Sequence, residues 1–328
     1  MGNPTECTHL RSIIMRYIGK SFVGLIVTLL IVSFVIFLVM EAVPGDPAEI
    51  ILGMSAQPDT LAALRSQLGL DQPFITRYLH WLFGLLQGDL GNSYTYSTSV
   101  AQLIGERLQV TLPLTGLAVF LSVLIALPLG VTAAAKPNGI VDIIASVFSQ
   151  IGISVPNFWI GLLLILGIAL TSGWFPAGGF PGWDAGMWAA LKALILPAIA
   201  LAIPQAAVLT RVTRAAVIEI ANEDFIRTAR AKGATLNYAL WYHVMPNALI
   251  PIVTMLGMQI SVLIAGAILV ENVFNLPGMG TLAYQALAQR DFIVIQNVVL
   301  FFAAIVMIIN FIVDALYTVL DPRLRIRR

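Results

Sequence analysis

Long apolar runs recur along the chain and predict helices that cross a membrane. A helix needs about 20 mainly apolar residues to span the hydrocarbon layer, and six windows of that kind are present. The first is too long for the core of a signal peptide and lacks a clear cleavage site of small residues. The six predicted spans cover residues 21–43, 108–135, 141–170, 188–209, 248–270 and 293–320.

Composition agrees with this pattern. Hydrophobic residues make up 59% of the 328 positions and charged residues 11%, whereas a soluble domain has about 25% charged residues. A surface so poor in charge can face lipid, where apolar side chains carry no penalty. The length would suit two soluble domains, but in a lipid bilayer it suits a single bundle. We therefore predict an all-α polytopic membrane protein with about six transmembrane helices.

The distribution of positive charge predicts the orientation. Lys and Arg concentrate in loops on the cytoplasmic side, and with six spans the two termini share one side. That side would hold 13 of the 18 Lys and Arg residues. The loop of residues 171–187, on the opposite side, has none. Both termini are therefore expected in the cytoplasm.

The long segment 44–107, between the first two spans, predicts helices outside the bilayer. Asp59 or Thr60 is expected to cap a short helix that ends at Gly69, and Asp71 is expected to cap a second. The segment is interpreted either as a structural collar or as a docking surface for an outer partner. Apolar residues recur at helical spacing in the second helix. They are Phe74, Tyr78, Trp81 and Leu85.

Two spans carry polar residues at helical spacing. Polar groups are costly in hydrocarbon, so these faces need partners. They can pack and hydrogen-bond against neighbouring helices, or they can line a path for a hydrated solute, and both interpretations stay open. Pro156 removes a hydrogen-bond donor and is expected to kink the third span. The candidate path residues are Gln150, Ser154 and Asn157 in the third span and Thr254, Met258 and Ser261 in the fifth.

The chain offers little for catalysis or metal binding. The single cysteine, Cys7, excludes a disulfide framework, and the three histidines lack metal-ligand spacing. No metalloprotease, nucleophile-elbow or dinucleotide motif occurs, and a net charge of +1 gives no case for nucleic acid. Residues 19–21 read Gly-Lys-Ser, but a phosphate-binding loop needs glycine where Ile14 stands. We therefore predict neither an enzyme nor a bound cofactor or metal.

The loop 211–247 is the longest and most basic of the predicted inner loops. Its composition is helical between residues 222 and 241, with an interruption at Gly233. Such a segment has two ordinary explanations. It can contact anionic lipid headgroups, or it can dock a cytoplasmic partner.

The same loop carries a recognisable motif. Residues 224–233 read Asp-Phe-Ile-Arg-Thr-Ala-Arg-Ala-Lys-Gly, and His-Val-Met-Pro follows nine residues later, at 243–246. This resembles the EAA loop of binding-protein-dependent ABC importer permeases, which reads Glu-Ala-Ala, three residues, Gly, nine residues, Ile-x-Leu-Pro. Ala229, Gly233 and Pro246 match in register. Arg at the Glu position, Thr at the first Ala, His at the Ile and Met at the Leu depart from the general pattern, but they resemble the dipeptide, oligopeptide and nickel branch of the family.

Other segments resemble the same branch in order and spacing, so that the resemblance covers nearly the whole chain from about residue 16. Together they are similar to the B type of permease subunit. The matching segments are Leu-Gly-Leu-Asp at 68–71, Gly-Asp-Leu-Gly at 88–91, Ser-Val-Pro-Asn-Phe-Trp at 154–159, Glu-Asn-Val-Phe-Asn-Leu-Pro-Gly-Met-Gly at 271–280 and Asp-Pro-Arg at 321–323.

The resemblance implies a type I ABC importer permease fold in the bacterial plasma (inner) membrane. Residues 1–107 would form the N-terminal tail, first span and extracytoplasmic segment, residues 108–320 the core with its cytoplasmic loop 211–247, and residues 321–328 a basic tail. The implied partners are a second homologous permease, two ATP-binding subunits and an extracytoplasmic solute-binding protein. ATP and Mg would bind those ATPase subunits and not this chain.

The resemblance also implies a coupling helix near residues 220–231, which would sit in a groove of the ATPase. Its basic residues could pair with acidic groups there, and Gly233 would let the chain turn sharply after the helix. The candidate coupling residues are Asp224, Arg227, Thr228, Ala229, Arg230, Lys232, Gly233 and Pro246.

The implied cargo is a short peptide, a dipeptide or oligopeptide, handed over by the binding protein. Nickel chelates, opines, glutathione and oligosaccharides remain open. A stand-alone secondary transporter would predict internal repeats and charges near mid-membrane, and neither is detected. An intramembrane enzyme would need a motif that is absent, and a structural or sensory protein would leave the inner loop unexplained.

Overall fold

The computed structural model describes residues 4–43, 45–53 and 57–320 of the chain. Within these ranges the secondary structure is helical, apart from one isolated bridge between Asn92 and Ser99. The predicted all-α fold is thus confirmed. The predicted basic tail at 321–328 lies outside the described residues.

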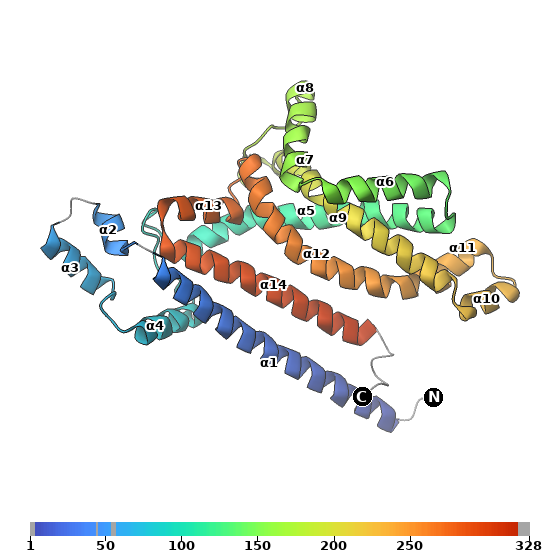
Figure 1. The fold of residues 1–328 in the computed structure, drawn as a ribbon, viewed down its shortest axis with the longest axis horizontal. Helices are drawn as coiled ribbons and strands as arrows, with labels where there is room; N and C mark the ends of the chain where they lie inside the picture. The colour runs from blue at the N-terminus through green and yellow to red at the C-terminus, as the bar shows by residue number, and fades with distance from the viewer. Residues whose placement is uncertain (1–3, 44, 54–56, 321–328) are drawn as a thin grey trace. The chain divides into compact units, whose positions relative to one another are not determined.

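Figure 1 shows the helices in chain order. The α-helices are α1 (Pro4–Ala42), α2 (Pro47–Leu52), α3 (Pro58–Gln67), α4 (Phe74–Gln87), α5 (Val100–Ala135), α6 (Ile140–Ser154), α7 (Asn157–Leu164), α8 (Leu170–Ser172), α9 (Met187–Ala221), α10 (Asp224–Ala231), α11 (Leu236–Ala239), α12 (Met245–Val273), α13 (Met279–Gln289) and α14 (Phe292–Leu320). Two π-helices, η1 (Ile165–Ala169) and η3 (Leu240–Val244), and one 3-10 helix, η2 (Trp183–Ala185), complete the set in the described ranges.

Five of the described helices are long and apolar enough to cross a membrane. They are α1, α5, α9, α12 and α14, and they confirm the first, second, fourth, fifth and sixth predicted spans. Several extend well past the predicted windows, because a helix continues into the polar layers on either side of the hydrocarbon as long as its backbone hydrogen bonds are made.

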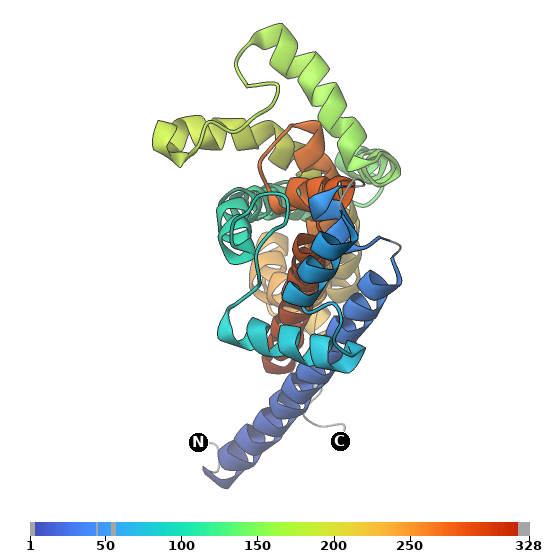
Figure 2. The ribbon, with the colours of Figure 1, turned by 90° about the vertical axis from the view of Figure 1, so that its left-hand side faces the viewer.

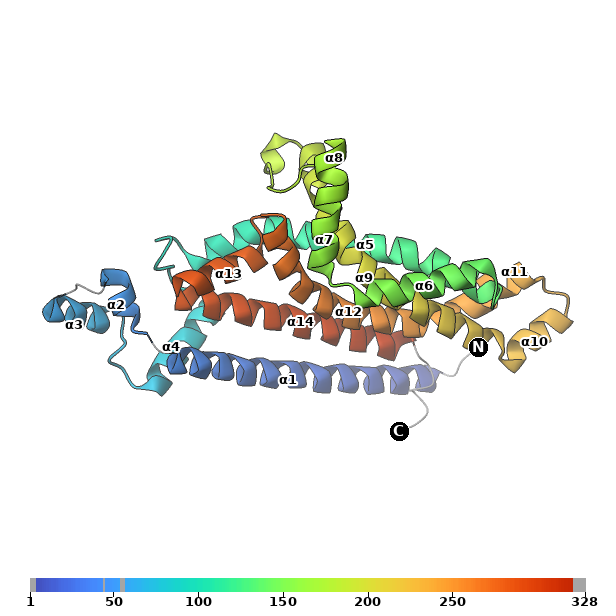
Figure 3. The same ribbon diagram turned by 45° about the horizontal axis from the view of Figure 1, so that its top comes forward.

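The third predicted span is wrong as one continuous helix. It consists of α6 and a second arm, Asn157–Ser172, that contains α7, η1 and α8, and the two arms are bent by 102° at Val155 and Pro156. Figure 3 shows α7 turning away from α6. Pro156 has no backbone N–H, and its ring disfavours helical backbone in the preceding residue. Val155 is accordingly extended, with φ −96° and ψ 125°. The predicted kink is confirmed, but Asn157 starts a new helix and does not share a face with Gln150 and Ser154.

The chain forms two compact units. The first contains described residues 4–23, 112–276 and 308–320, and the second contains residues 24–111 and 277–307 apart from position 44 and positions 54–56. The first unit therefore includes the whole loop 211–247, and the second includes the long segment between α1 and α5. The domain boundaries predicted at residues 107 and 320 stay a prediction.

Small residues place α9 at the centre of the first unit. The helices α6, α7 and α12 all pack along it, as Figures 1 and 3 show. A Cβ added to Gly152 of α6 would lie 2.6 Å from the Cβ of Ala207 on α9. A Cβ added to Gly130 of α5 would lie 2.7 Å from the side chain of Thr213 and 2.9 Å from the carbonyl oxygen of Thr210. Close approach at small residues is the usual basis of helix packing in lipid.

The second unit has an apolar core and an aromatic cluster. The core brings together the start of α5, α13 and the start of α14 around fully buried Val100, Met279 and Leu282. The aromatic cluster joins α1 to α4, and Figure 2 shows α4, in cyan, crossing α1. Tyr78 lies 5.6 Å from Phe37, ring to ring, and its hydroxyl is 3.0 Å from that of Ser33. The predicted apolar face of α4 is therefore confirmed where it meets α1.

The predicted helix caps in this segment are wrong. The α3 helix begins at Pro58, so that Asp59 and Thr60 lie in its first turn and do not cap it. The α4 helix is preceded by Pro73 with no side-chain cap, and Asp71 lies outside the helix start. Proline favours the first turn because its fixed φ suits a helix and its missing N–H is not needed there. The α3 helix ends at Gln67, and Gly69, with φ +69°, lies two residues beyond, close to the end that the sequence predicts.

A buried carboxylate closes the second unit. Asp291 is 1% exposed and precedes α14. The Ser93 hydroxyl donates to it at 2.6 Å, and the backbone N–H of Thr95 donates to it at 3.1 Å. The N–H of Val294 also donates to it, at 3.3 Å. Asp291 therefore ties the start of α14 to a loop almost two hundred residues earlier in the chain.

Asp291→Ala is expected to destabilise the protein by roughly 2–4 kcal/mol, because hydrogen bonds to a charged group contribute about 1.5–3 kcal/mol each and the donors left behind are buried. Thermal unfolding of the purified protein in detergent measures this loss. Asp291→Asn keeps the shape and one acceptor, and it should lose less. Equal unfolding temperatures for wild type and Asp291→Ala would contradict this assignment.

Candidate functional site

The cytoplasmic end of the first unit carries the first candidate site. Helix α9 ends at Ala221, and α10 follows after a two-residue break at Asn222 and Glu223. The coupling helix predicted at 220–231 is therefore wrong in its start, which the structure puts at Asp224. At the break, the Asn222 side chain donates to the carbonyl of Ile218 at 2.9 Å, and Glu223 is extended.

One buried side chain anchors α10. Ile226 is 3% exposed and lies in an apolar cluster with Val217 of α9, Ala239 of α11 and Val244 of η3. The other residues of α10 are exposed or half-buried. A short helix held by one apolar face leaves its opposite face free for a partner. The anchor at Ile226 connects α10 to α9, α11 and η3.

A hollow of about 710 Å³ lies beside this anchor. Phe225, Thr228 and Lys232 line one side, and Tyr238 and His243 line the other. Beyond the hollow, Trp241 and Tyr242 are 59% and 67% exposed. Exposed aromatic side chains rimmed by polar ones are typical of protein contact surfaces. We call this surface, from Phe225 to Tyr242, the α10–α11 surface.

Positive charge surrounds the α10–α11 surface. Arg227, Arg230 and Lys232 are exposed. In the described part of the chain, Arg227 has one ion pair, with Asp224 at 3.6 Å, while Arg230 and Lys232 have none. An exposed pair contributes little, about 0–1 kcal/mol. The three cations are therefore available for acidic groups of a partner.

Gly233 ends α10 with a sharp turn. Its φ is +96°, a value that L side chains rarely adopt, and no atom lies within 4 Å of an added Cβ. Backbone conformation, and not lack of space, therefore requires glycine here. The N–H of Ala234 closes the turn on the carbonyl of Ala229 at 3.2 Å. Pro246, the last member of the motif, lies in the first turn of α12.

An ion pair that sequence reasoning missed holds α6 to α9 near this end. The Arg214 guanidinium donates to both carboxylate oxygens of Asp142, at 2.8 Å for one of them. The N–H of Asn138 also donates to that carboxylate at 2.8 Å. Asp142 is 4% exposed. The two partners are 72 residues apart, so no local pattern links them.

Arg214→Gln is expected to destabilise the protein by roughly 1–2 kcal/mol, below the ~3–5 kcal/mol for a fully buried pair, because the arginine is partly exposed. The double variant with Asp142→Asn should recover part of the loss, since no unpaired charge then remains. Thermal unfolding in detergent measures both. Arg211→Gln, an exposed arginine of the same helix, is the matched control and should be neutral. A double variant no better than Arg214→Gln would refute the pairing.

The candidate path residues of α6 and α7 lie in different surroundings. Gln150 and Ser154 are exposed on α6. The Ser154 hydroxyl donates to the carbonyl of Gln150 at 2.8 Å, within its own helix. Asn157 is half-buried at the start of α7 and meets Gly266 of α12, where an added Cβ would contact its amide. The α7–α12 contact is thus one place where the two predicted polar spans come together.

On α12 the candidates differ in exposure. Met258 is 60% exposed, while Thr254 and Ser261 are half-buried. Thr254 donates to the carbonyl of Ile250 at 3.0 Å. The Ser261 hydroxyl is buried and finds no hydrogen-bond partner among the described residues. The arrangement supports interhelical packing for part of this face, and the path role of these residues stays a prediction.

Sequence reasoning missed a buried polar contact between α12 and α9. The side-chain amide of Gln259 donates to the carbonyl of Gln205 at 3.3 Å, and Gln259 is 5% exposed. Its position among apolar residues was visible in the sequence, but its partner was not. In the described ranges, no group of three or more His, Cys, Asp or Glu residues could hold a metal ion.

The chain thus combines helices that are long and apolar enough to cross a membrane with a basic, partly apolar surface at one end of the first unit. Residues 126–326 match the family described as the binding-protein-dependent transport system inner membrane component, and residues 14–115 match the N-terminal region of such components. The chain belongs to this family. It is a multi-pass protein of the bacterial inner membrane, the permease subunit of an ABC importer.

Several relatives match along nearly their whole length. A probable peptide ABC transporter permease of Sinorhizobium fredii is 38% identical over 94% of this chain and 99% of its own. A putative peptide transport system permease of Brucella abortus is 41% identical over 90% of this chain and 95% of its own. A glutathione transport system permease of Salmonella typhimurium is 38% identical over 95% of this chain and 99% of its own.

A solved structure supports the fold. The chain is similar to an inward-facing structure of the MetNI methionine ABC transporter, with a TM-score of 0.55, 21% identity, and coverage of 67% of this chain and 97% of the other. At this identity the likeness concerns the fold alone. It agrees with the type I importer permease fold that the sequence predicts.

Proposed function

We propose that this chain, paired with a second homologous permease, forms the translocation path for short peptides handed over by an extracytoplasmic binding protein. Two ATP-binding subunits on the cytoplasmic side bind ATP and Mg and drive the transport. We place the catalytic groups for this work on those subunits and not on this chain. Peptide permeases among its relatives, at 38–41% identity over nine-tenths of the chain or more, support the cargo.

The α10–α11 surface is the observation that carries the proposal. Its exposed aromatic side chains and its free cations suit an acidic groove on an ATPase. Ile226 anchors α10 to α9 and η3, and η3 runs directly into α12. A movement of the ATPase would therefore be passed to two long helices of the first unit as a nearly rigid displacement. Asp224, Arg227, Thr228, Ala229, Arg230, Lys232, Gly233 and Pro246 are the proposed coupling residues.

Glutathione is a second candidate cargo. It is itself a short peptide, and one relative at 38% identity is a glutathione permease. We do not propose nickel chelates, opines or oligosaccharides as the cargo. A polar path formed by Gln150, Ser154, Asn157, Thr254, Met258 and Ser261 would suit any of these solutes, because the binding protein does most of the selecting.

Purification of the tagged chain from its native membrane in mild detergent tests the proposed assembly. We expect an ATPase and a second permease to co-purify, and the identity of the accompanying binding protein narrows the cargo. A variant with Arg227→Glu and Arg230→Glu should lose the ATPase and keep the second permease. A lone, monodisperse chain under conditions that preserve other membrane complexes would argue against the assembly.

A further inference from the structure

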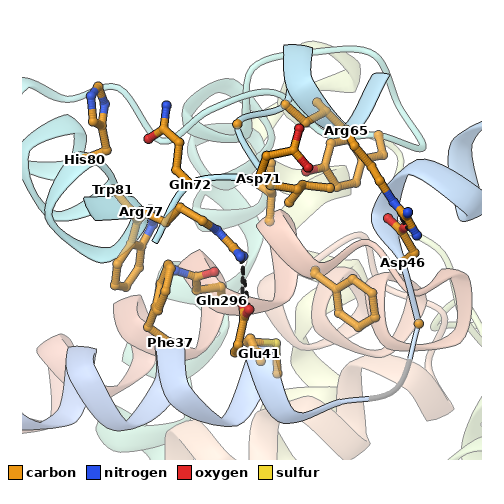
Figure 4. A pocket seen from close by; sticks show the side chains of 18 of the residues that line it. Phe37, Glu41, Asp46, Arg65, Asp71, Gln72, Arg77, His80, Trp81 and Gln296 are labelled. Carbon is orange, nitrogen blue, oxygen red and sulfur yellow. Dashed lines mark hydrogen bonds and ion pairs between the residues drawn. The ribbon is translucent and has the colours of Figure 1, made fainter. Parts of the chain in front are cut away.

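A polar cavity lies within the second unit, far along the chain from the α10–α11 surface. Its volume is about 640 Å³, in the range of small-molecule sites. The outer end of α1, the α3–α4 loop, α4 and the start of α14 contribute its walls. Figure 4 shows its side chains converging from these elements. None of the proposed coupling or path residues lines this cavity.

The charges around this cavity do not cancel. Arg77 donates to both oxygens of Glu41, at 3.0 and 2.6 Å, and this pair is drawn dashed in Figure 4. Arg65 pairs with Asp46. Asp71, in the α3–α4 loop, forms no ion pair with any described residue. Arg65 also lies 3.7 Å from Glu49, outside the cavity lining. The lining itself holds two arginines and three carboxylates, and this surplus negative charge favours a cationic group.

The same cavity has donors without acceptors. The indole N–H of Trp81 and the amide of Gln296 are buried, and within the described residues neither has a hydrogen-bond partner. Buried donors without acceptors are rare because each carries a desolvation cost. Burial, and next the Asp291 carboxylate, raise the pKa of the Tyr94 hydroxyl in the same wall to about 12. The wall therefore offers donors to a ligand with carbonyl or carboxylate oxygens.

An apolar face completes the cavity. The rings of Phe37 and Trp81 lie 5.7 Å apart on its α1–α4 side. Such a face suits an apolar side chain, and an indole also attracts a nearby ammonium group. Among the described residues, the site therefore combines one carboxylate without an ion pair, two donors without acceptors and an aromatic wall.

We propose that this cavity is a peptide-binding subsite on the extracytoplasmic side of the permease, in which Asp71 holds the terminal ammonium and the Trp81 and Gln296 side chains donate to peptide oxygens. This rests on the proposed peptide cargo and adds a second point of recognition besides the binding protein. A short peptide released from the binding protein would be held here by its free amino end before it enters the path.

Binding of alanyl-phenylalanine to the purified transporter complex in nanodiscs, without the binding protein, tests this subsite. We expect saturable binding by calorimetry. N-acetyl-alanyl-phenylalanine, which lacks the ammonium, should bind at least about tenfold more weakly. Asp71→Asn should weaken binding of the free peptide by a similar factor and should not change binding of the acetylated one. Trp81→Phe and Gln296→Leu should each weaken both. Asp59→Asn, a carboxylate of α3 outside the cavity, is the matched control and should leave binding unchanged.

Three results would overturn the subsite: no saturable binding, equal binding of the acetylated peptide, or wild-type binding by Asp71→Asn. The last two would assign the cavity to another occupant, such as a lysine-bearing segment of the binding protein. ATP-driven uptake of the same peptide into proteoliposomes, with the binding protein present, separates this failure from failure of the proposed function. Uptake without binding here rejects the subsite alone, whereas uptake of some other solute but of no peptide rejects the cargo.

Discussion

Gly233→Asp is expected to lower peptide uptake by about an order of magnitude or more while the protein still inserts into the membrane. The φ of +96° at this position costs a non-glycine residue about 1–2 kcal/mol, and such a cost shifts a local equilibrium by roughly five- to thirtyfold. The turn after α10 would then open, and the two sides of the α10–α11 surface would no longer face the same hollow. Uptake by whole cells, compared with the amount of permease in the membrane, measures the effect.

Gly233→Ala separates backbone strain from charge. An alanine at this position meets no atom within 4 Å, so any loss it causes comes from backbone conformation. We expect an intermediate loss of uptake for Gly233→Ala and the larger one for Gly233→Asp, which also puts a negative charge beside Lys232. Normal uptake by Gly233→Asp would remove this segment from the coupling role.

Gly130→Val is expected to separate α5 from α9 and to destabilise the protein by more than about 2 kcal/mol, since overpacking in a well-packed core costs typically 1–3 kcal/mol. The first added carbon would already lie 2.9 Å from the Thr210 carbonyl oxygen, and a backbone group in a long helix cannot turn aside as a side chain can. Transport should fall as well, because α9 leads into α10. Thermal unfolding of the purified complex measures the loss.

Gly116→Val is the matched control on the same helix. No atom lies within 4 Å of a Cβ added there, so the same substitution should leave the unfolding temperature close to that of wild type. If both variants unfold alike, the loss reflects valine within α5 and not the α5–α9 contact.

Much of the fold could be predicted from the sequence. Apolar windows of about 20 residues are a strong signal, because lipid forces a spanning chain to satisfy its backbone within a helix. The windows therefore identified α1, α5, α9, α12 and α14. The interruption at Gly233 and the helical composition on either side of it could also be predicted, since glycine and helical composition are local properties.

The remaining features depend on contacts that no local pattern contains. The pairs Asp142–Arg214 and Asp291–Ser93 join residues far apart in the chain, so their geometry requires the fold. The bend at Pro156 could be expected, but its size of 102° could not, because it depends on how α7 packs against α12 and α9. The wrong caps at α3 and α4 have a local cause, since a proline in or before the first turn replaces a capping side chain.

The cavity in the second unit could not be predicted at all. Asp71, Trp81 and Gln296 come from three separate segments, and two of them looked like a helix cap and part of an apolar face. Only the structure shows that, among the described residues, the indole and the amide find no acceptor and a carboxylate nearby forms no ion pair. Such a combination comes from tertiary placement and not from residue type.

Peptide uptake into proteoliposomes that contain this chain together with its co-purified partners is the most direct test of the account. We expect uptake that requires both internal ATP and the external binding protein, and that stops when either is left out. Uptake by this chain alone, driven by a proton gradient in the absence of ATP, would contradict it and identify a self-sufficient carrier.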